Sequence, residues 1–140
     1  MLLVVLAPLI AALVIGLAFA GLRAQNRRQL QLVGRVVEPP PRPAPERPSI
    51  LYFTGVNCTI CHTAQKPALE SLRALLDSGV VIREVDVADE PELARSYRVM
   101  SLPTTIVLNA DGEVRAINAG FASVDRLRSQ VESAGVFAAA

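Results

Sequence analysis

The sequence is poor in the residue types on which small disulfide-rich and nucleic-acid-binding proteins depend. Its 140 residues include no tryptophan, one histidine and two cysteines, and aromatic residues make up only 4% of the total. Two cysteines cannot build a disulfide framework. A formal net charge of +1 gives no support to nucleic-acid binding. The length allows one domain of ordinary size with an appendage.

The first 22 residues lack any charged side chain, and 19 of them are Ala, Val, Ile, Leu, Met or Phe. As a helix this run is about 33 Å long, enough to cross a hydrocarbon core of roughly 30 Å. We therefore predict a transmembrane anchor over residues 1–22. A cleavable signal peptide is the alternative, because Ala18, Phe19 and Ala20 match the small-residue cleavage pattern. The lack of Lys or Arg before the run argues against that alternative.

Basic charge follows the apolar run directly, since residues 23–37 contain four arginines and no acidic residue (Arg23, Arg27, Arg28 and Arg35). Cytoplasmic flanks of membrane helices collect Lys and Arg, so this asymmetry predicts a single-pass membrane protein whose later residues face the cytoplasm. An extracytoplasmic orientation stays open. Residues 49–140 carry 8 basic and 11 acidic residues, so the basic charge belongs to the membrane flank.

Residues 23–48 are predicted to form a basic juxtamembrane segment and a linker. The stretch from 30 to 37 is compatible with a longer helix or with an extra edge strand. Residues 38–48 hold six of the ten prolines, a composition that favours an extended spacer with a rise of about 3.1 Å per residue. The predicted limits are therefore 1–22 for the anchor, 23–48 for the linker and 49–140 for the folded domain.

The folded domain is predicted to alternate strands and helices. Gly79 is the expected C-terminal cap of the first helix, Pro67 is expected to kink it, and Ser123 and Gly135 are expected to bound the last helix. The order is βαβαββα, which predicts an α/β sandwich with a mixed sheet and helices on both faces. The hydrophobic patterns place strands at 49–54, 80–87, 104–109 and 113–118, and helices at 59–77, 90–97 and from 124 onward.

The two cysteines lie in a CxxC motif between the end of a strand and the start of a helix. At a helix start, unpaired N–H groups and the helix dipole stabilise a thiolate on Cys58. A thiolate attacks a disulfide and forms a mixed disulfide with the partner. Cys61 lies three residues further on the same helix face, where it can displace the partner. The pattern thus predicts Cys58 as the attacking thiol and Cys61 as the resolving thiol.

From about Ser49 to Ala134 the sequence resembles the thioredoxin superfamily in several motifs in the same order. These are Cys58-Thr-Ile-Cys61 after a strand, Pro67 in the next helix, the segment 85–99, Ser101-Leu102-Pro103-Thr104, and Asp111-Gly112-Glu113 followed by Gly120. The resemblance implies the minimal thioredoxin-like fold and a thiol:disulfide oxidoreductase that needs no cofactor. It also implies protein substrates with thiols or disulfides, and an upstream redox donor or acceptor.

The resemblance implies site residues as well. Cys58 and Cys61 form the redox-active disulfide, Pro103 has a cis peptide bond beside them, and the Leu102 backbone pairs with an extended substrate. Asn57 and Ser101 complete the expected substrate surface. Asn57 departs from the family pattern, because many members have tryptophan there.

Other departures concern proton transfer and the helix after the motif. Tyr52 occupies the position of the family's buried aspartate, and Glu84 that of its lysine partner. We therefore hypothesise that Glu84, His62 or a water molecule assists Cys61. Pro67 comes one residue later than in thioredoxin, which predicts a π-bulge between Cys61 and Pro67.

Three other interpretations of the motif remain. Cys58, Cys61 and His62 also match the c-type haem attachment pattern, with Met100 as a conceivable sixth ligand. The same three side chains are candidate copper or zinc ligands, although a closed zinc site needs a fourth. The two cysteines are finally compatible with purely structural thiols. Strands flank the motif, which favours the redox interpretation over haem.

Overall fold

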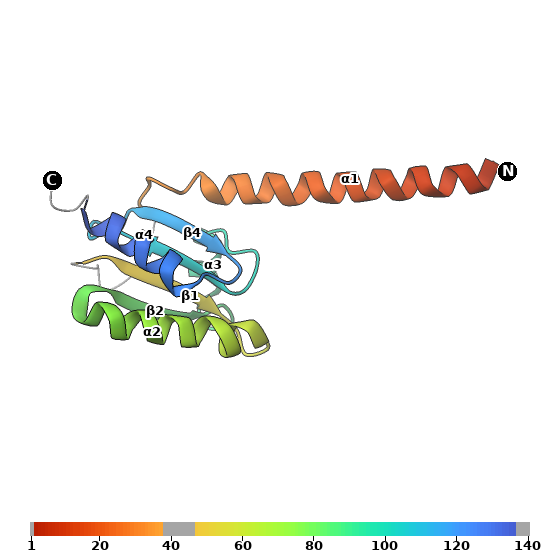
Figure 1. Cartoon of the computed structure of the whole chain (residues 1–140). Coiled ribbons are helices and arrows are strands. Elements are labelled where there is room, and N and C mark those ends of the chain that lie inside the picture. Colours follow the sequence, from red (N-terminus) through yellow and green to blue (C-terminus); the bar gives the residue numbers. More distant parts are fainter. Residues whose placement is uncertain (1, 38–46, 137–140) are drawn as a thin grey trace. The chain divides into compact units, whose positions relative to one another are not determined.

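The computed structural model describes residues 2–37 and 47–136, which divide into two units separated after Gln31. The first unit contains one helix, and the second contains a sheet with its helices (Figure 1). The elements are α1 (Leu2–Leu30), β1 (Ser49–Thr54), a π-helical turn η1 (Cys61–Gln65), α2 (Lys66–Leu76), a 3-10 turn η2 (Asp77–Gly79), β2 (Val81–Asp86), α3 (Pro91–Ser96), β3 (Thr104–Leu108), β4 (Val114–Ala119) and α4 (Val124–Val136).

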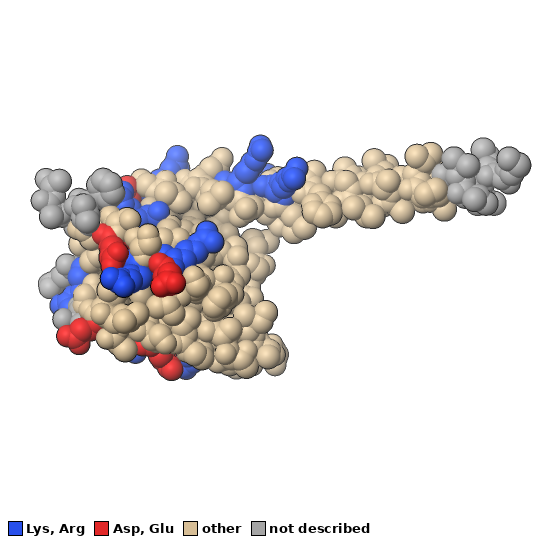
Figure 2. Space-filling view, in the orientation of Figure 1, with Lys and Arg blue, Asp and Glu red and all other residues tan. Residues whose placement is uncertain are grey.

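The helix of the first unit is long and apolar enough over Leu6–Leu30 to cross a membrane. Its large side chains are exposed, for example Leu9 at 63% and Leu17 at 65%, as expected of a surface that meets lipid. Figure 2 shows Lys and Arg gathered toward the C-terminal part of this helix, after a long uncharged stretch. A signal sequence near an N-terminus meets the same criteria of length and composition.

The second unit is built on a four-stranded mixed sheet with the strand order β2-β1-β3-β4. Strand β1 runs parallel to β2 and antiparallel to β3, and β3 runs antiparallel to β4. The predicted βαβαββα order and the mixed sheet are confirmed. In the register, Tyr52 of β1 lies opposite Glu84 of β2 and Thr105 of β3.

Side chains of the central strand β1 alternate between two cores, one on each face of the sheet. Ile50 and Tyr52 pack with α2 and α4, whereas Leu51 and Phe53 pack with α3. All four are at most 2% exposed, because helices cover both faces of the strand. The core under α2 and α4 also contains Cys61, Leu69, Leu72, Val107, Ala122, Leu127, Val131 and Ala134, and the core under α3 contains Val85, Leu93, Ala94, Tyr97, Ile106, Leu108 and Val114.

Two predicted helix ends differ from the structure. Helix α2 ends at Leu76, and Asp77 instead of Gly79 has a positive φ after it, with φ of 47° and ψ of −118°. Gly135 lies inside α4, which continues to Val136. Helix α2 therefore stops without a glycine at its C-terminal cap. The N-terminal cap of α4 is as predicted, since Ser123 Oγ accepts the Arg126 N–H at 3.4 Å.

The structure decides between the two predictions for residues 30–37, a longer helix or an extra edge strand. After Leu30 the helix ends, and Val36 forms an isolated antiparallel bridge with Glu113, the residue before β4. The N–H of Gly34 also donates to the carbonyl of Val114 at 2.8 Å. The stretch after Leu30 thus pairs with the edge of the sheet through a single bridge and does not continue the helix. The predicted proline-rich spacer lies largely outside the described residues.

The turn between β3 and β4 fits its sequence signal. The side-chain oxygen of Asn109 accepts the N–H groups of Asp111 and Glu113 at 3.1 and 2.8 Å. Gly112 has a φ of 79°, the left-handed conformation that glycine adopts most readily. This tight turn places β4 and the following loop, residues 120–123, next to the sheet end that carries the cysteines.

Candidate redox site

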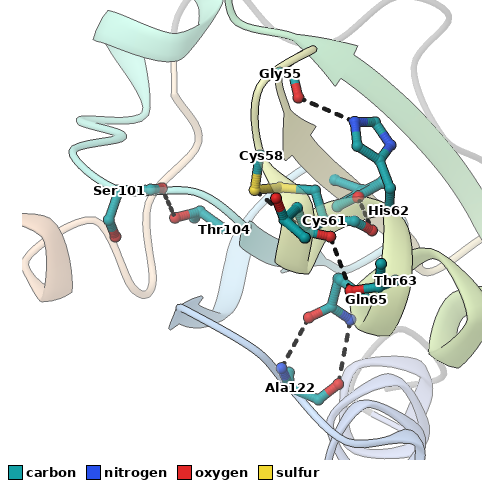
Figure 3. Close-up of a disulfide and its surroundings, with 11 residues drawn as sticks. Gly55, Cys58, Cys61, His62, Thr63, Gln65, Ser101, Thr104 and Ala122 are labelled. Atoms are coloured by element: carbon teal, nitrogen blue, oxygen red, sulfur yellow. Dashed lines mark hydrogen bonds between the residues drawn. A yellow bond between two sulfur atoms is a disulfide. The ribbon is translucent and has the colours of Figure 1, made fainter.

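Cys58 and Cys61 form a disulfide, with their sulfur atoms 2.04 Å apart, between the end of β1 and the π-helical turn (Figure 3). Cys61 is completely buried, whereas Cys58 is partly exposed. The backbone N–H of Cys61 donates to the sulfur of Cys58 at 3.2 Å. An attacking group from solvent therefore meets Cys58 first, and the same N–H can stabilise negative charge on that sulfur.

The helix after the motif begins with the π-helical turn that the position of Pro67 predicts. The N–H of Lys66 donates to the carbonyl of Cys61, five residues earlier, and Pro67 occupies the first turn of α2. Proline has no N–H, so it fits best in a first helical turn. The π-helical turn thus absorbs the extra residue. The regular helix α2 starts directly after it, with Pro67 among its first residues. The expected π-bulge is confirmed.

Tyr52 of β1 is hydrogen-bonded to the π-helical turn. Its hydroxyl donates to the carbonyl of Cys61 at 2.8 Å, and the side chain is 2% exposed. Burial is the main cause that raises the pKa of Tyr52 above its usual value, and the carboxylate of Glu84 raises it further. The phenol is therefore a neutral hydrogen-bond donor at physiological pH. At the position where the resemblance implies a buried aspartate, the chain thus has a tyrosine that donates a hydrogen bond to the backbone.

The two side chains named for proton transfer have other partners. Glu84 forms an ion pair with Lys66 at 3.3 Å, and both side chains are about half exposed (48% and 47%). The ring Nε2 of His62 lies 3.2 Å from the carbonyl of Gly55, on the exposed side of the turn (Figure 3). The structure thus places His62 beside the motif and pairs Glu84 with Lys66, the residue after the π-helical turn. Their proposed role in proton transfer stays a prediction.

The loop before β3 completes one side of the site. The peptide bond between Leu102 and Pro103 is cis, as the resemblance implies. Leu102 packs against both cores, and a Cβ added to Gly55 would lie 3.2 Å from its Cδ1. Gly55 therefore permits close approach of the loop. Ser101 is exposed, and its carbonyl accepts the hydroxyl of Thr104 at 2.7 Å.

A surface groove of about 420 Å³ lies beside the exposed sulfur. The structure brings three predicted site residues together in its lining, namely Cys58, Asn57 and Leu102. Ser101 and Glu84 are not among its lining residues. The remaining lining residues are Gly55, Val56, Asp86, Val87 and Ala88.

Sequence reasoning missed Gln65, a completely buried residue of the π-helical turn. Its side-chain oxygen accepts the N–H of Ala122 at 2.8 Å, and its side-chain nitrogen donates to the carbonyl of the same residue at 3.2 Å (Figure 3). A signal was available, because Gln65 lies four residues after Cys61 and four before Leu69. That spacing places a polar residue on the buried helix face.

Neither metal nor haem ligation is favoured by this arrangement. Within residues 2–37 and 47–136, no three Cys, His, Asp or Glu side chains gather as ligands for a metal ion. The sulfurs are bonded to each other, and the histidine ring faces the Gly55 carbonyl. The motif is part of a strand-rich sandwich, whereas haem c domains are mainly helical.

Comparison with known proteins identifies the class. Residues 43–135 match the family of thioredoxin-like domains, so the chain belongs to this family. Over 65 residues it is 38% identical to thioredoxin from Bacillus subtilis (strain 168), a match that covers 46% of this chain. The match spans 62% of that relative's length, which is less than two thirds.

Solved structures agree with the family assignment. The chain is similar to thioredoxin-2, described as a component of malaria parasite protein secretion machinery, with 28% identity, a TM-score of 0.58 and coverage of 62% of this chain and 82% of that one. A mutant thioredoxin from Halobacterium salinarum NRC-1 is 26% identical, with a TM-score of 0.57 and coverage of 64% and 76%. The family, the fold and the cysteine pair together support a thiol-disulfide oxidoreductase.

Proposed function

We propose that this chain is a membrane-tethered oxidoreductase that exchanges disulfides with cysteine pairs of partner proteins. The observation that carries the proposal is the disulfide between a partly exposed Cys58 and a buried Cys61 at the start of a helix. Such a pair offers one sulfur to a partner and keeps the other in reserve. The adjoining groove gives the partner chain a place to bind.

The exchange proceeds in two balanced steps. A substrate thiolate attacks the sulfur of Cys58, the bond to Cys61 breaks, and its electron pair leaves on the sulfur of Cys61, which takes up a proton. A second substrate thiolate then attacks the substrate sulfur of this mixed disulfide and releases Cys58 as a thiolate. The substrate has gained a disulfide, and the chain has gained two electrons and one proton, which is on Cys61, while Cys58 is a thiolate. The reverse sequence reduces a substrate disulfide.

Substrate recognition is proposed to use the lining of the groove. Asn57 and Leu102 flank Cys58, so an extended segment bound there would hold its own sulfur near the exposed one. The loop of Ser101 and Pro103 supports the Leu102 backbone that pairs with such a segment. A second protein, an upstream donor or acceptor of electrons, would restore the starting state of the cysteines.

The tether and its direction belong to the same proposal. Helix α1 is proposed to span the membrane as the anchor, followed by the linker to residue 48 and the domain from residue 49. The arginines after the apolar run favour a cytoplasmic domain. A topology reporter fused after Ala140 tests this orientation. If a reporter that is active only outside the cytoplasm gives a signal, the domain faces the other side of the membrane.

The activity is tested with the full chain in detergent and a disulfide-bonded protein substrate. Cys58→Ser is expected to abolish exchange, because the sulfur that meets the substrate is lost. Cys61→Ser is the matched variant, expected to accumulate mixed disulfides because no thiol releases the partner. Equal residual activity in the two variants, with no trapped adduct, would refute the proposal.

A further inference from the structure

Gln65 connects two segments that are far apart in sequence and both next to the disulfide. It belongs to the same π-helical turn as Cys61, and its two side-chain hydrogen bonds both go to the backbone of Ala122. Ala122 is 1% exposed and lies in the loop between β4 and α4. Without the amide, a buried N–H and a buried carbonyl would lose their partner, which is costly.

The loop that Gln65 holds is also bonded to the Pro103 loop. The N–H of Gly120 donates to the carbonyl of Pro103 at 2.8 Å, and Gly120 has a φ of 93°. The hydrogen-bonded path thus runs from the Cys61 turn through Gln65 and Ala122 to the loop of Leu102, which lines the groove. Between Gly120 and Ala122, the side chain of Phe121 is 53% exposed.

We propose that Gln65 is a positioning residue for disulfide exchange, which holds loop 120–123 against the Cys61 turn so that the protein-binding surface is formed before a substrate arrives. The inference rests on the proposed function. A surface ordered in advance avoids the entropic cost of ordering a loop during binding, and this appears as a lower KM for large substrates. A small disulfide needs only the exposed sulfur and gains little from the loop.

The amide is suited to this task because it offers one donor and one acceptor side by side. A protonated carboxylic acid has the same pair, whereas a carboxylate only accepts hydrogen bonds. Gln65→Glu should therefore imitate the wild type when protonated and repel the Ala122 carbonyl when ionised. Gln65→Leu lacks both polar atoms at every pH.

The experiment measures KM and kcat of the full chain in detergent, with a disulfide-bonded protein and with a small aromatic disulfide. For Gln65→Leu we expect KM for the protein substrate to rise about tenfold, while the rate with the small disulfide stays within about twofold. For Gln65→Glu we expect KM to return toward the wild-type value as the pH falls from about 8 to about 6, because burial raises the pKa of an introduced carboxyl group. The wild type, measured over the same pH range, corrects for the titration of native groups.

Gln130 provides the matched control. Its amide makes a similar reciprocal pair with Asn118, at 2.8 and 3.0 Å, between α4 and β4. Gln130→Leu and Gln130→Glu should leave both KM values and their pH dependence at wild-type levels. Equal effects at the two glutamines, or equal losses with both substrates in Gln65→Leu, would overturn the inference. An inactive wild type would instead overturn the proposed function itself.

Discussion

The two faces of the sheet show how one strand can serve chemistry and packing at once. On the face under α2 and α4, the buried side chains of Tyr52 and Gln65 both have hydrogen-bond partners next to the disulfide. On the face under α3, Phe53 and Tyr97 pack with their ring centroids 6.0 Å apart. The Tyr97 hydroxyl has no hydrogen-bond partner among the described residues.

The difference teaches where polar groups are tolerated in this core. Tyr52 and Gln65 each hold a backbone group beside the redox site, namely the Cys61 carbonyl and the Ala122 peptide groups. The core around Phe53 and Tyr97 depends mainly on apolar burial. We therefore expect substitutions of core residues under α3 to change stability more than exchange activity. Substitutions of the buried polar residues under α2 are expected to change activity as well.

Phe53→Ala is expected to have the largest effect on stability. Phe53 is 0% exposed, and truncation of a buried phenylalanine costs about 3–5 kcal/mol through lost contacts and the cavity left behind. Pulse proteolysis of the full chain in increasing urea measures the loss. Exchange activity per folded molecule should stay within about twofold of wild type. A stable but inactive variant would show that the two faces are not separate in function.

Tyr52→Phe is expected to cost about 1 kcal/mol in the free energy of unfolding. The ring stays, but the Cys61 carbonyl loses the donor at 2.8 Å and keeps the Lys66 N–H. The π-helical turn should then loosen, with faster amide exchange at Lys66, measured by hydrogen exchange and mass spectrometry. Unchanged protection of that amide would contradict the supporting role of Tyr52.

Glu84→Gln and His62→Ala are expected to have smaller effects, on the pH profile of exchange. Because Glu84 pairs with Lys66 and His62 lies at the Gly55 carbonyl, we expect water to carry the proton to and from Cys61. Each variant should then shift the midpoint of the pH–rate profile by less than about half a unit. A larger shift in one variant would assign the proton transfer to that residue.

Tyr97→Phe is expected to have the smallest effect at neutral pH, within about 0.5 kcal/mol, because it removes a buried hydroxyl with no partner in the described part of the chain. Burial raises the pKa of Tyr97 to about 12 from its usual 10. The folded state thus retains this proton more strongly, and the resulting stability is present below pH 10 and lost as the pH rises toward 12. Unfolding experiments over that range should show a shallower loss in the variant, and parallel curves would contradict the assignment.

Much of the fold could be predicted from local patterns. Residues 49–54 form a strand because a short β-branched and aromatic run ends at a glycine, and the observed strand has those limits. The position of Pro67, one residue later than in thioredoxin, predicted the π-helical turn that absorbs the extra residue. The predicted C-terminal cap of α2 was wrong, because Asp77 has the positive φ that Gly79 was expected to supply.

The polar supports of the site could not be predicted in the same way. The bonds between Gln65 and Ala122 join residues 57 positions apart, and no local pattern pairs them. Tyr52 could be recognised as a replacement for an acid, but its acceptor depends on where the π-helical turn places the Cys61 carbonyl. Such tertiary hydrogen bonds follow from the packing of whole elements.

The most direct test of the redox assignment is an equilibrium titration of the full chain in buffers of reduced and oxidised dithiothreitol, with free thiols counted by alkylation and mass spectrometry. We predict a reversible transition in which Cys58 and Cys61 change state together, with two alkylated sulfurs in the reduced form. Sulfurs that remain bonded in every reducing buffer, or that never re-form the bond on oxidation, would contradict the account.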